Sequence, residues 1–180
     1  MEVRKGSPSN RKGRLERENR VYEWLDTLQI DYESIDHHRA DTLEACRSVE
    51  SVLKVSICKN LFLCNRQKTN FYLLMMPGEK LFKTKELSAQ IQSSRLSFAD
   101  EEAMLEFLDI QPGAVSILGL INDTKKRVSL LVDEDLLKQD FIGCHPCVCT
   151  STLKIKKEDL FGKYLESTHH TMQVVHLEGK

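Results

Sequence analysis

Lys59, Asn60 and His145 are among the side chains of this 180-residue sequence whose types could serve acyl chemistry. A lysine ammonium can hold a phosphate or a sugar, and it favours the negative charge that builds on a carbonyl oxygen under attack. Asn60 offers both a donor and an acceptor, and Pro146 restricts the backbone of His145 and so fixes the direction of its ring. Taken singly, such residues are more often a surface lysine, a turn asparagine and a histidine satisfied by its neighbours.

Two glycines could bring backbone groups close to a bound ligand. Gly113, followed by Ala114, ends the turn QPG and could supply backbone amides to an acyl group. Gly143 lies two residues before His145 and could approach a ligand in the same way. For both glycines, an ordinary turn is the competing interpretation.

Three of the six cysteines, Cys144, Cys147 and Cys149, cluster around His145. Cysteine, histidine and a CxxC spacing are typical of zinc sites, but structural zinc sites usually join two separate ligand pairs. The remaining cysteines stand alone in segments predicted as helix or strand, which favours small buried thiols over zinc. The pattern therefore indicates reduced thiols, and we expect neither a metal nor another cofactor.

The charge of the chain is almost balanced, with 26 Lys and Arg against 27 Asp and Glu. Bulk electrostatic attraction to DNA or RNA is thereby excluded, so any nucleic acid must be bound at a local site. Residues 1–20 nevertheless carry a net charge of +4. We expect residues 1–14 to form a flexible basic segment, either solvated or touching phosphates, and residues 15–180 to form one domain.

The length and the 41% hydrophobic content are typical of an ordinary globular protein. No apolar run approaches the ~20 residues that a membrane span needs. The N-terminus also lacks the apolar stretch of a signal peptide. We therefore expect a cytoplasmic protein that does not bind membranes.

Apolar periodicity predicts helices and strands that interleave along the chain. Helices are expected over residues 16–28, 42–49 (with Asp41 or Thr42 as N-cap), 85–91, 100–108 and 156–166. Strands are expected over residues 32–37, 60–64, 70–76, 128–132 and 173–177, with two extended pieces within 141–155. The segments 60–64 and 70–76 are joined by a polar turn and predict a hairpin. The interleaving favours an α/β domain with a mixed sheet.

Three segments, in this order and spacing, resemble the YbaK/prolyl-tRNA-synthetase-associated editing family. They are residues 59–63 (KNLFL), residues 95–104 with 111–116 (RLSFADEEAM and QPGAVS), and Asp133 with residues 145–146 and 150–152 (HP and TST). A weaker element is His37 with Thr42 and Glu44, where His38 stands at a position that is usually proline. The resemblance extends from about residue 24 to 177 and is strongest to the free-standing alanyl-tRNA(Pro) deacylases.

The resemblance implies a single α/β domain with a mixed, partly barrel-like sheet flanked by helices. It also implies hydrolysis of the ester that joins a wrong amino acid, alanine above all, to the 3′ end of tRNA(Pro). The implied partners are the CCA end of that tRNA and prolyl-tRNA synthetase, with no DNA. No metal is implied, and a vicinal hydroxyl of the terminal adenosine assists. The implied catalytic residues are Lys59, Asn60 and His145, and the implied substrate-binding residues are Gly113, Ala114, Gly143, Pro146 and Cys149.

One departure from the family pattern bears on specificity. The family usually has an asparagine four residues after the histidine of the HP pair, and this chain has Cys149 there. A thiol is a weaker hydrogen-bonding group than an amide, so the polarity of the amino-acid pocket changes. The alternatives are therefore a deacylase for another small amino acid such as Cys, Ser or Thr, or a module that binds aminoacyl-tRNA without hydrolysing it.

Overall fold

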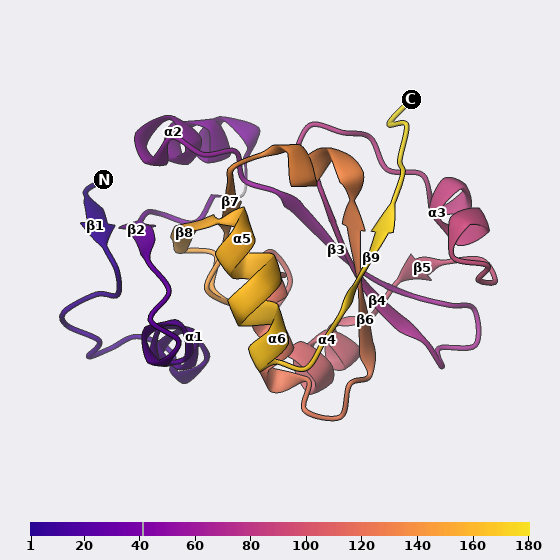
Figure 1. Ribbon diagram of the computed structural model, residues 1–180, viewed down its shortest axis with the longest axis horizontal. Coiled ribbons are helices and arrows are strands. Elements are labelled where there is room, and N and C mark those ends of the chain that lie inside the picture. Colours follow the sequence, from indigo (N-terminus) through magenta and orange to yellow (C-terminus); the bar gives the residue numbers. More distant parts are fainter. Residues whose placement is uncertain (41) are drawn as a thin grey trace.

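The strands form two sheets that lie side by side, at the left and the right of Figure 1. The structure is a computed structural model that describes residues 1–40 and 42–180. The first sheet is antiparallel, in the order β1-β2-β8-β7. Its strands are β1 (Val3–Lys5), β2 (Tyr32–Asp36), β7 (Phe141–Cys144) and β8 (Ser151–Lys156).

The second sheet is mixed, in the order β5-β3-β4-β6-β9. Its strands are β3 (Lys59–Cys64), β4 (Phe71–Met76), β5 (Ser97–Phe98), β6 (Val128–Asp133) and β9 (Met172–Val175). The hairpin β3–β4 and the pair β3–β5 are antiparallel, whereas β4, β6 and β9 run parallel. The apolar runs of β4 and β6 fit the centre of a sheet that is covered on both faces.

Gly143 joins the two sheets. The residue forms a parallel bridge with Ile57, and its carbonyl oxygen accepts a hydrogen bond from the amide of Cys58 at 3.1 Å. A Cβ atom at Gly143 would lie 2.9 Å from the backbone oxygen of Ser56, closer than real contacts allow. The partly barrel-like sheet implied by the sequence is thus two sheets that meet at this glycine, within the mixed α/β domain that was predicted.

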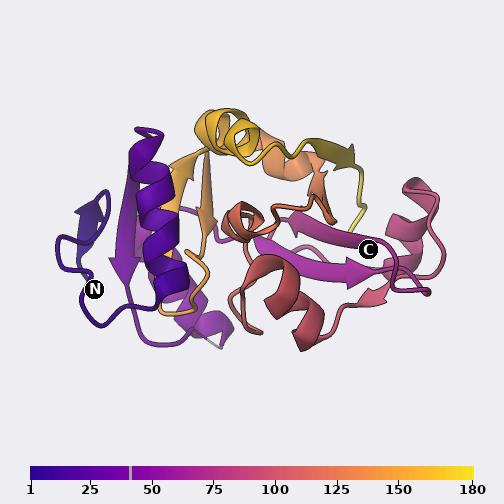
Figure 2. The same ribbon diagram turned by 90° about the horizontal axis from the view of Figure 1, so that it is seen from below.

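The helices cover the sheets and fill the space between them (Figures 1 and 2). They are α1 (Glu16–Thr27), α2 (Leu43–Leu53), α3 (Thr84–Gln90), α4 (Glu101–Leu108) and a C-terminal helix made of α5 (Lys157–Asp159), a π-helical turn (Leu160–Tyr164) and α6 (Leu165–Ser167). Two 3₁₀ segments, Ile117–Asn122 and Glu134–Lys138, precede and follow β6. The hydroxyl of Thr42 caps α2 and the carboxylate of Asp100 caps α4, each accepting from the amide three residues on.

The main core contains the inner side chains of both sheets, α1, α4 and the C-terminal helix. A second apolar cluster lies on the other face of the β3–β4–β6–β9 sheet, beneath α3 and the C-terminal segment. Side chains alternate along β3, so Phe62 and Cys64 enter the main core while Leu61 and Leu63 enter the second cluster. The two faces of β3 therefore present different environments at its first residues, Lys59 and Asn60.

The predicted elements are confirmed with shifts of at most two residues at their ends, except that α2 extends four residues beyond the predicted end. Asp41, the alternative N-cap for α2, lies outside the described residues. The short strands β1 and β5 and the 3₁₀ segments were not predicted, because two- or three-residue strands carry no periodicity. None of the described helices is long and apolar enough to span a membrane.

Residues 1–14, for which composition predicts a flexible basic segment, contact the rest of the domain at several points. Here β1 pairs with β2, and Arg4 and Arg14 both form ion pairs with Asp36 at 2.6 Å. Arg11 forms a further ion pair with Asp26 at 2.6 Å. Much of the positive charge of this segment is therefore neutralised by acidic groups of the domain, and the same contacts attach the segment to it.

Candidate active site

Lys59 begins β3 and is held by a backbone carbonyl. Its Nζ atom donates to the backbone oxygen of Lys80 at 2.6 Å. Lys80 is fixed in turn, because its own Nζ lies 2.7 Å from carboxylate oxygens of both Asp133 and Asp135. Burial by itself would lower the pKa of Lys80, but the hydrogen bonds with the two aspartates outweigh it and raise the pKa. Lys59 is therefore a half-buried cation, and the residue that accepts its hydrogen bond is held in place by two ion pairs.

Two surface depressions meet at Lys59. One has a volume of about 590 Å³ and lies between α2 and the start of β3, with Cys46, Cys58 and Gly78 in its wall. The other has a volume of about 600 Å³ and follows β3 toward Phe98. A substrate group in either depression would have the ammonium of Lys59 at its edge.

Asn60 points to the opposite face of β3 from Lys59. Its Nδ2 atom donates to the backbone oxygen and to Sγ of Cys58, both at 3.3 Å. These contacts fix the amide so that Oδ1 points away from Cys58. Oδ1 is buried and has no hydrogen-bond partner among the described residues. A buried acceptor without a donor costs about 1–3 kcal/mol, so this atom is suited to receive an N–H or O–H group from a ligand.

His145 is almost buried in the loop between β7 and β8. Its Nδ1 atom lies 2.8 Å from the backbone oxygen of Ser151, which can only accept, so Nδ1 carries the hydrogen. Burial lowers the pKa of His145, and the ring is therefore neutral at pH 7. Nε2 then has a free lone pair, and no hydrogen bond to Nε2 is found in the described part of the chain. The ring can accept a proton or a hydrogen bond.

A hydroxyl connects His145 with a second histidine. Thr152 Oγ1 lies 2.8 Å from Nε2 of His37 and 3.4 Å from Nδ1 of His145. Nδ1 of His37 is 2.7 Å from the backbone oxygen of His38, so Nδ1 is the donor and Nε2 accepts from the Thr152 hydroxyl. The centroids of the two imidazole rings are 6.1 Å apart. Sequence reasoning placed His37 only in the weaker part of the resemblance and missed this pairing.

Several of the predicted substrate-binding residues share one cavity. Ala114 and Cys149 line a cavity of about 300 Å³, with Arg39 and Thr150 also in its wall. Gly113 stands beside it with a φ of +90°, a conformation that glycine adopts without strain, and a Cβ atom there would meet the Arg39 guanidinium at 3.6 Å. The turn that was predicted at residues 111–113 is confirmed.

Pro146 and Gly143, which were also predicted to bind substrate, are packed against other parts of the chain. Pro146 is buried in the loop that follows β7. The space above the Cα atom of Gly143 is filled by the backbone of Ser56 and Ile57. The close approach that the sequence predicts at Gly143 is therefore made by the protein's own chain.

None of the six cysteines forms a disulfide, and four of them are buried. Burial raises the pKa of Cys58 to about 11 and of Cys147 to about 12, and it raises that of Cys144 well above its ordinary value. These thiols stay protonated at neutral pH and are poor nucleophiles and poor ligands. No cluster of three or more His, Cys, Asp or Glu side chains that could hold a metal occurs among the described residues.

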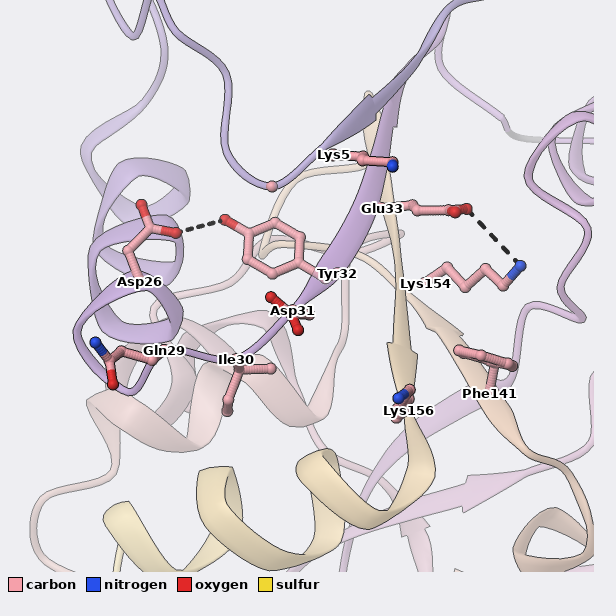
Figure 3. Close-up of a pocket in the computed structure, with 11 residues that line it drawn as sticks. Lys5, Asp26, Gln29, Ile30, Asp31, Tyr32, Glu33, Phe141, Lys154 and Lys156 are labelled. Carbon is pink, nitrogen blue, oxygen red and sulfur yellow. Dashed lines mark hydrogen bonds and ion pairs between the residues drawn. The ribbon is translucent and has the colours of Figure 1, made fainter.

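The structure thus arranges the predicted residues in three groups. Lys59 and Asn60 flank the start of β3, beside Gly143; His145 pairs with His37 through Thr152; Ala114 and Cys149 share a cavity with Gly113 at its side. The backbone amide of His37 donates to the backbone oxygen of Thr150, in the wall of that cavity, at 3.0 Å. Within the part of the chain that the structure describes, no hydrogen bond joins Lys59 or Asn60 to the other two groups. A further cavity of about 540 Å³ on the outer face of the first sheet contains none of the predicted residues (Figure 3).

The profile that describes an aminoacyl-tRNA editing domain matches residues 37–162. The chain therefore belongs to the aminoacyl-tRNA editing domain family. It is 30% identical to the prolyl-tRNA editing protein ProX of Acetoanaerobium sticklandii, over 85% of this chain and 93% of the relative. It is 32% identical to prolyl-tRNA synthetase associated domain-containing protein 1 of Danio rerio, over 83% of this chain and 81% of the relative.

A solved structure supports the fold. The crystal structure of a candidate trans-editing enzyme for prolyl-tRNA synthetase superposes with a TM-score of 0.68, over 91% of this chain and 97% of that one. The two sequences are 17% identical, so this likeness concerns the architecture alone. The range matched by the family profile contains every predicted site residue, from Lys59 to Cys149.

Proposed function

We propose that this protein is a trans-editing deacylase that hydrolyses the ester of mischarged tRNA(Pro), with Ala-tRNA(Pro) as its main substrate. Membership of the editing family and the names of its relatives, which concern prolyl-tRNA editing, support the reaction class. Such an activity is useful because a pocket built for proline discriminates a smaller side chain by only about 1–3 kcal/mol per methylene. A second site that accepts only small amino acids removes the error.

The observation that carries the proposal is the unpartnered Oδ1 of Asn60. An aminoacyl ester has a free α-amino group, which is a donor, beside the carbonyl that is attacked. Oδ1 of Asn60 is a buried acceptor held in one orientation by two contacts to Cys58. The α-amino group would supply the missing donor, and the ester would then be oriented at the start of β3.

Lys59 and His145 have complementary roles in this proposal. The ammonium of Lys59 stabilises the negative charge on the carbonyl oxygen as water adds to the carbonyl carbon. Nε2 of neutral His145 accepts a hydrogen bond from that water or from the substrate. The ester C–O bond then breaks, and the 3′ oxygen of the terminal adenosine takes the proton. An aminoacyl ester is already activated, so positioning and charge stabilisation account for most of the catalysis.

The preference for alanine is proposed on the size and composition of the cavity beside Gly113. Ala114 and Cys149 contribute small side chains to the wall of this cavity, whose volume is about 300 Å³. Cys149 replaces the amide usual in the family, so a slightly larger or more polar group, such as the side chain of Cys, Ser or Thr, is the alternative substrate. Prolyl-tRNA synthetase is the expected protein partner, because it releases the mischarged tRNA.

The test is a panel of tRNA(Pro) esterified with Ala, Cys, Ser, Thr or Pro, each incubated with the purified protein. Loss of the radiolabelled ester is followed against the spontaneous rate. We expect Ala-tRNA(Pro) to be hydrolysed fastest and Pro-tRNA(Pro) to be spared. Tight binding of all five without acceleration would instead identify a non-catalytic aminoacyl-tRNA binding module and overturn the proposal.

A further inference from the structure

A groove with the composition of a single-stranded nucleic-acid site extends from Lys59. Its volume is about 600 Å³, and its wall includes Lys59, Lys83, Lys85, Phe82 and Phe98. β5 pairs only with the last two residues of β3, so the groove follows the part of β3 next to Lys59 that lacks a neighbouring strand on this side, within the described residues. The groove therefore leads directly to the proposed reaction centre.

The aromatic side chains of this groove are exposed at a position where stacking is possible. Phe98 is 63% exposed, the largest exposed fraction among the large apolar side chains of the described residues. The ring of Phe82 supports it edge-on, with centroids 6.5 Å apart. An exposed ring with one free face is suited to stack on a nucleobase, which contributes about 1–3 kcal/mol per base.

The charges in the groove are all positive. Lys83 and Lys85 are exposed and form no ion pair with other described residues, and no acidic side chain of the described chain lines the groove. By contrast, the cavity of Figure 3 is balanced in charge, because its wall contains three lysines (Lys5, Lys154 and Lys156) and three acids (Asp26, Asp31 and Glu33). One of these pairs, Lys154 with Glu33, is already an ion pair at 3.7 Å. Of the two surfaces, the groove at Lys59 therefore has the charge that favours a phosphate backbone.

We infer that the groove binds the single-stranded 3′ end of a tRNA, with one base stacked on Phe98 and phosphates beside Lys83 and Lys85. This inference rests on the proposed function, because it places the terminal ester at Lys59, where the groove ends. It accounts for RNA binding by a protein of balanced charge whose N-terminal arginines Arg4, Arg11 and Arg14 are engaged in ion pairs. Three cations and one aromatic platform give a modest, salt-sensitive affinity.

The test measures binding of uncharged RNA, so it does not depend on hydrolysis. A fluorescent acceptor-stem hairpin ending in single-stranded ACCA is titrated with wild-type protein, Phe98→Ala and Lys83→Ala/Lys85→Ala, and anisotropy is recorded. The matched controls are Phe141→Ala and Lys156→Ala, an exposed aromatic and an exposed lysine of the cavity in Figure 3. Thermal melting of each variant verifies folding, and a blunt hairpin without the ACCA end shows the contribution of the single strand.

We expect Phe98→Ala to weaken binding about tenfold and to abolish the advantage of the ACCA end. The double lysine variant should reduce the slope of log K against log salt concentration by the amount expected for about one to two lost phosphate contacts. Both controls should bind like wild type. Equal losses in Phe98→Ala and Phe141→Ala, or no loss in either, would overturn the inference.

The remaining outcomes separate the groove from the proposed reaction. If the protein hydrolyses Ala-tRNA(Pro) and Phe98→Ala leaves the RNA affinity unchanged, the deacylase activity is supported and the assignment of the groove is wrong. If Phe98→Ala loses the ACCA-dependent binding but the wild-type protein hydrolyses no ester, the groove is confirmed as an RNA site and the proposed deacylase activity is wrong. If Phe98→Ala instead weakens only co-elution with prolyl-tRNA synthetase, the groove binds a protein and the RNA assignment is wrong.

Discussion

The ammonium of Lys59 donates to the backbone oxygen of Lys80 at 2.6 Å, and this contact links the start of β3 to a buried ion pair. Lys80 bridges Asp133, which ends β6 with a fully buried side chain, and Asp135 in the 3₁₀ segment that follows. A lysine side chain is flexible and loses conformational entropy when it is held in place. The support from Lys80 orders Lys59 before any substrate arrives.

Asp133→Asn should therefore impair catalysis as well as stability. Removing one partner of a buried ion pair costs about 3–5 kcal/mol, and because Asp135 remains as a partner of Lys80 we expect a loss of about 2 kcal/mol by urea denaturation. At a temperature where the variant is folded by circular dichroism, we expect kcat for ester hydrolysis to fall with little change in KM. Asp31→Asn, at an exposed position on another surface, is the control and should leave both quantities unchanged. An unaltered kcat in Asp133→Asn would show that Lys80 does not position Lys59.

Asn60→Ala should separate function from stability. The substitution removes a buried oxygen that has no hydrogen-bond partner among the described residues, so the folded state loses an unfavourable group along with two weak contacts to Cys58. We expect the melting temperature to stay constant or rise, while kcat/KM for Ala-tRNA(Pro) falls at least about tenfold. A large loss of stability, or full activity, would mean that Oδ1 of Asn60 does not await a substrate donor.

The pH dependence of hydrolysis should follow His145. Burial lowers the pKa of this ring below its ordinary value near 6.5, so the neutral form that accepts at Nε2 persists at pH values where a free histidine is protonated. We expect kcat/KM, corrected for spontaneous hydrolysis, to stay level below pH 6.5 and to fall only on further acidification. His145→Gln should be slower and should lack this acid limb. An acid limb above pH 6.5 would contradict the assignment.

The same shift has a consequence for stability. The unfolded chain binds a proton at His145 near pH 6.5, whereas the folded chain does not until the pH is lower. Stability is therefore lost as the pH falls from 6.5 toward the folded pKa, and it is regained above 6.5. Urea denaturation of wild-type protein and His145→Gln across this range should show a smaller loss in the variant.

The N-terminal segment should be protease-resistant until its anchor is removed. Asp36 accepts from Arg4, Arg14 and Ser151, and these hydrogen bonds outweigh burial and hold the pKa of its carboxyl well below the ordinary range. We expect Asp36→Asn to expose residues 1–14 to trypsin and to lower the melting temperature by a few degrees, on the order of 1 kcal/mol. Asp31→Asn is again the control. Equal cleavage rates in wild type and Asp36→Asn would show that the ion pairs do not attach the segment.

Elements that depend on neighbouring residues could be predicted from the sequence, whereas contacts between residues distant in the sequence could not. The hairpin β3–β4 follows from two apolar runs and a polar turn, and the helices α1 and α4 follow from apolar periodicity. Residues 1–14 were assigned by composition, which cannot reveal that Arg4 finds Asp36, 32 residues along the chain. The attachment of this segment is a tertiary effect that overrides local propensity.

The candidate site shows the same division. Lys59, Asn60 and His145 were identified by resemblance, but their environments depend on residues distant in sequence. Thr152, which joins His145 to His37, is 115 positions from His37, and Asp133 is 53 positions from Lys80. Gly143 was expected near a ligand because glycine permits close approach, and the structure uses that property to join the two sheets. A single sequence contains no signal that distinguishes these uses.

The most direct test of the central claim is the single-turnover rate of Ala-tRNA(Pro) hydrolysis by wild-type protein and Lys59→Ala. Removing one group that stabilises the developing oxyanion costs about 10²–10³ in rate, so we predict a loss of that size in Lys59→Ala, with tRNA affinity much less affected. Lys156→Ala, an exposed lysine on another surface, should match wild type. Hydrolysis by Lys59→Ala at the wild-type rate, or no acceleration by the wild-type protein, would contradict the account.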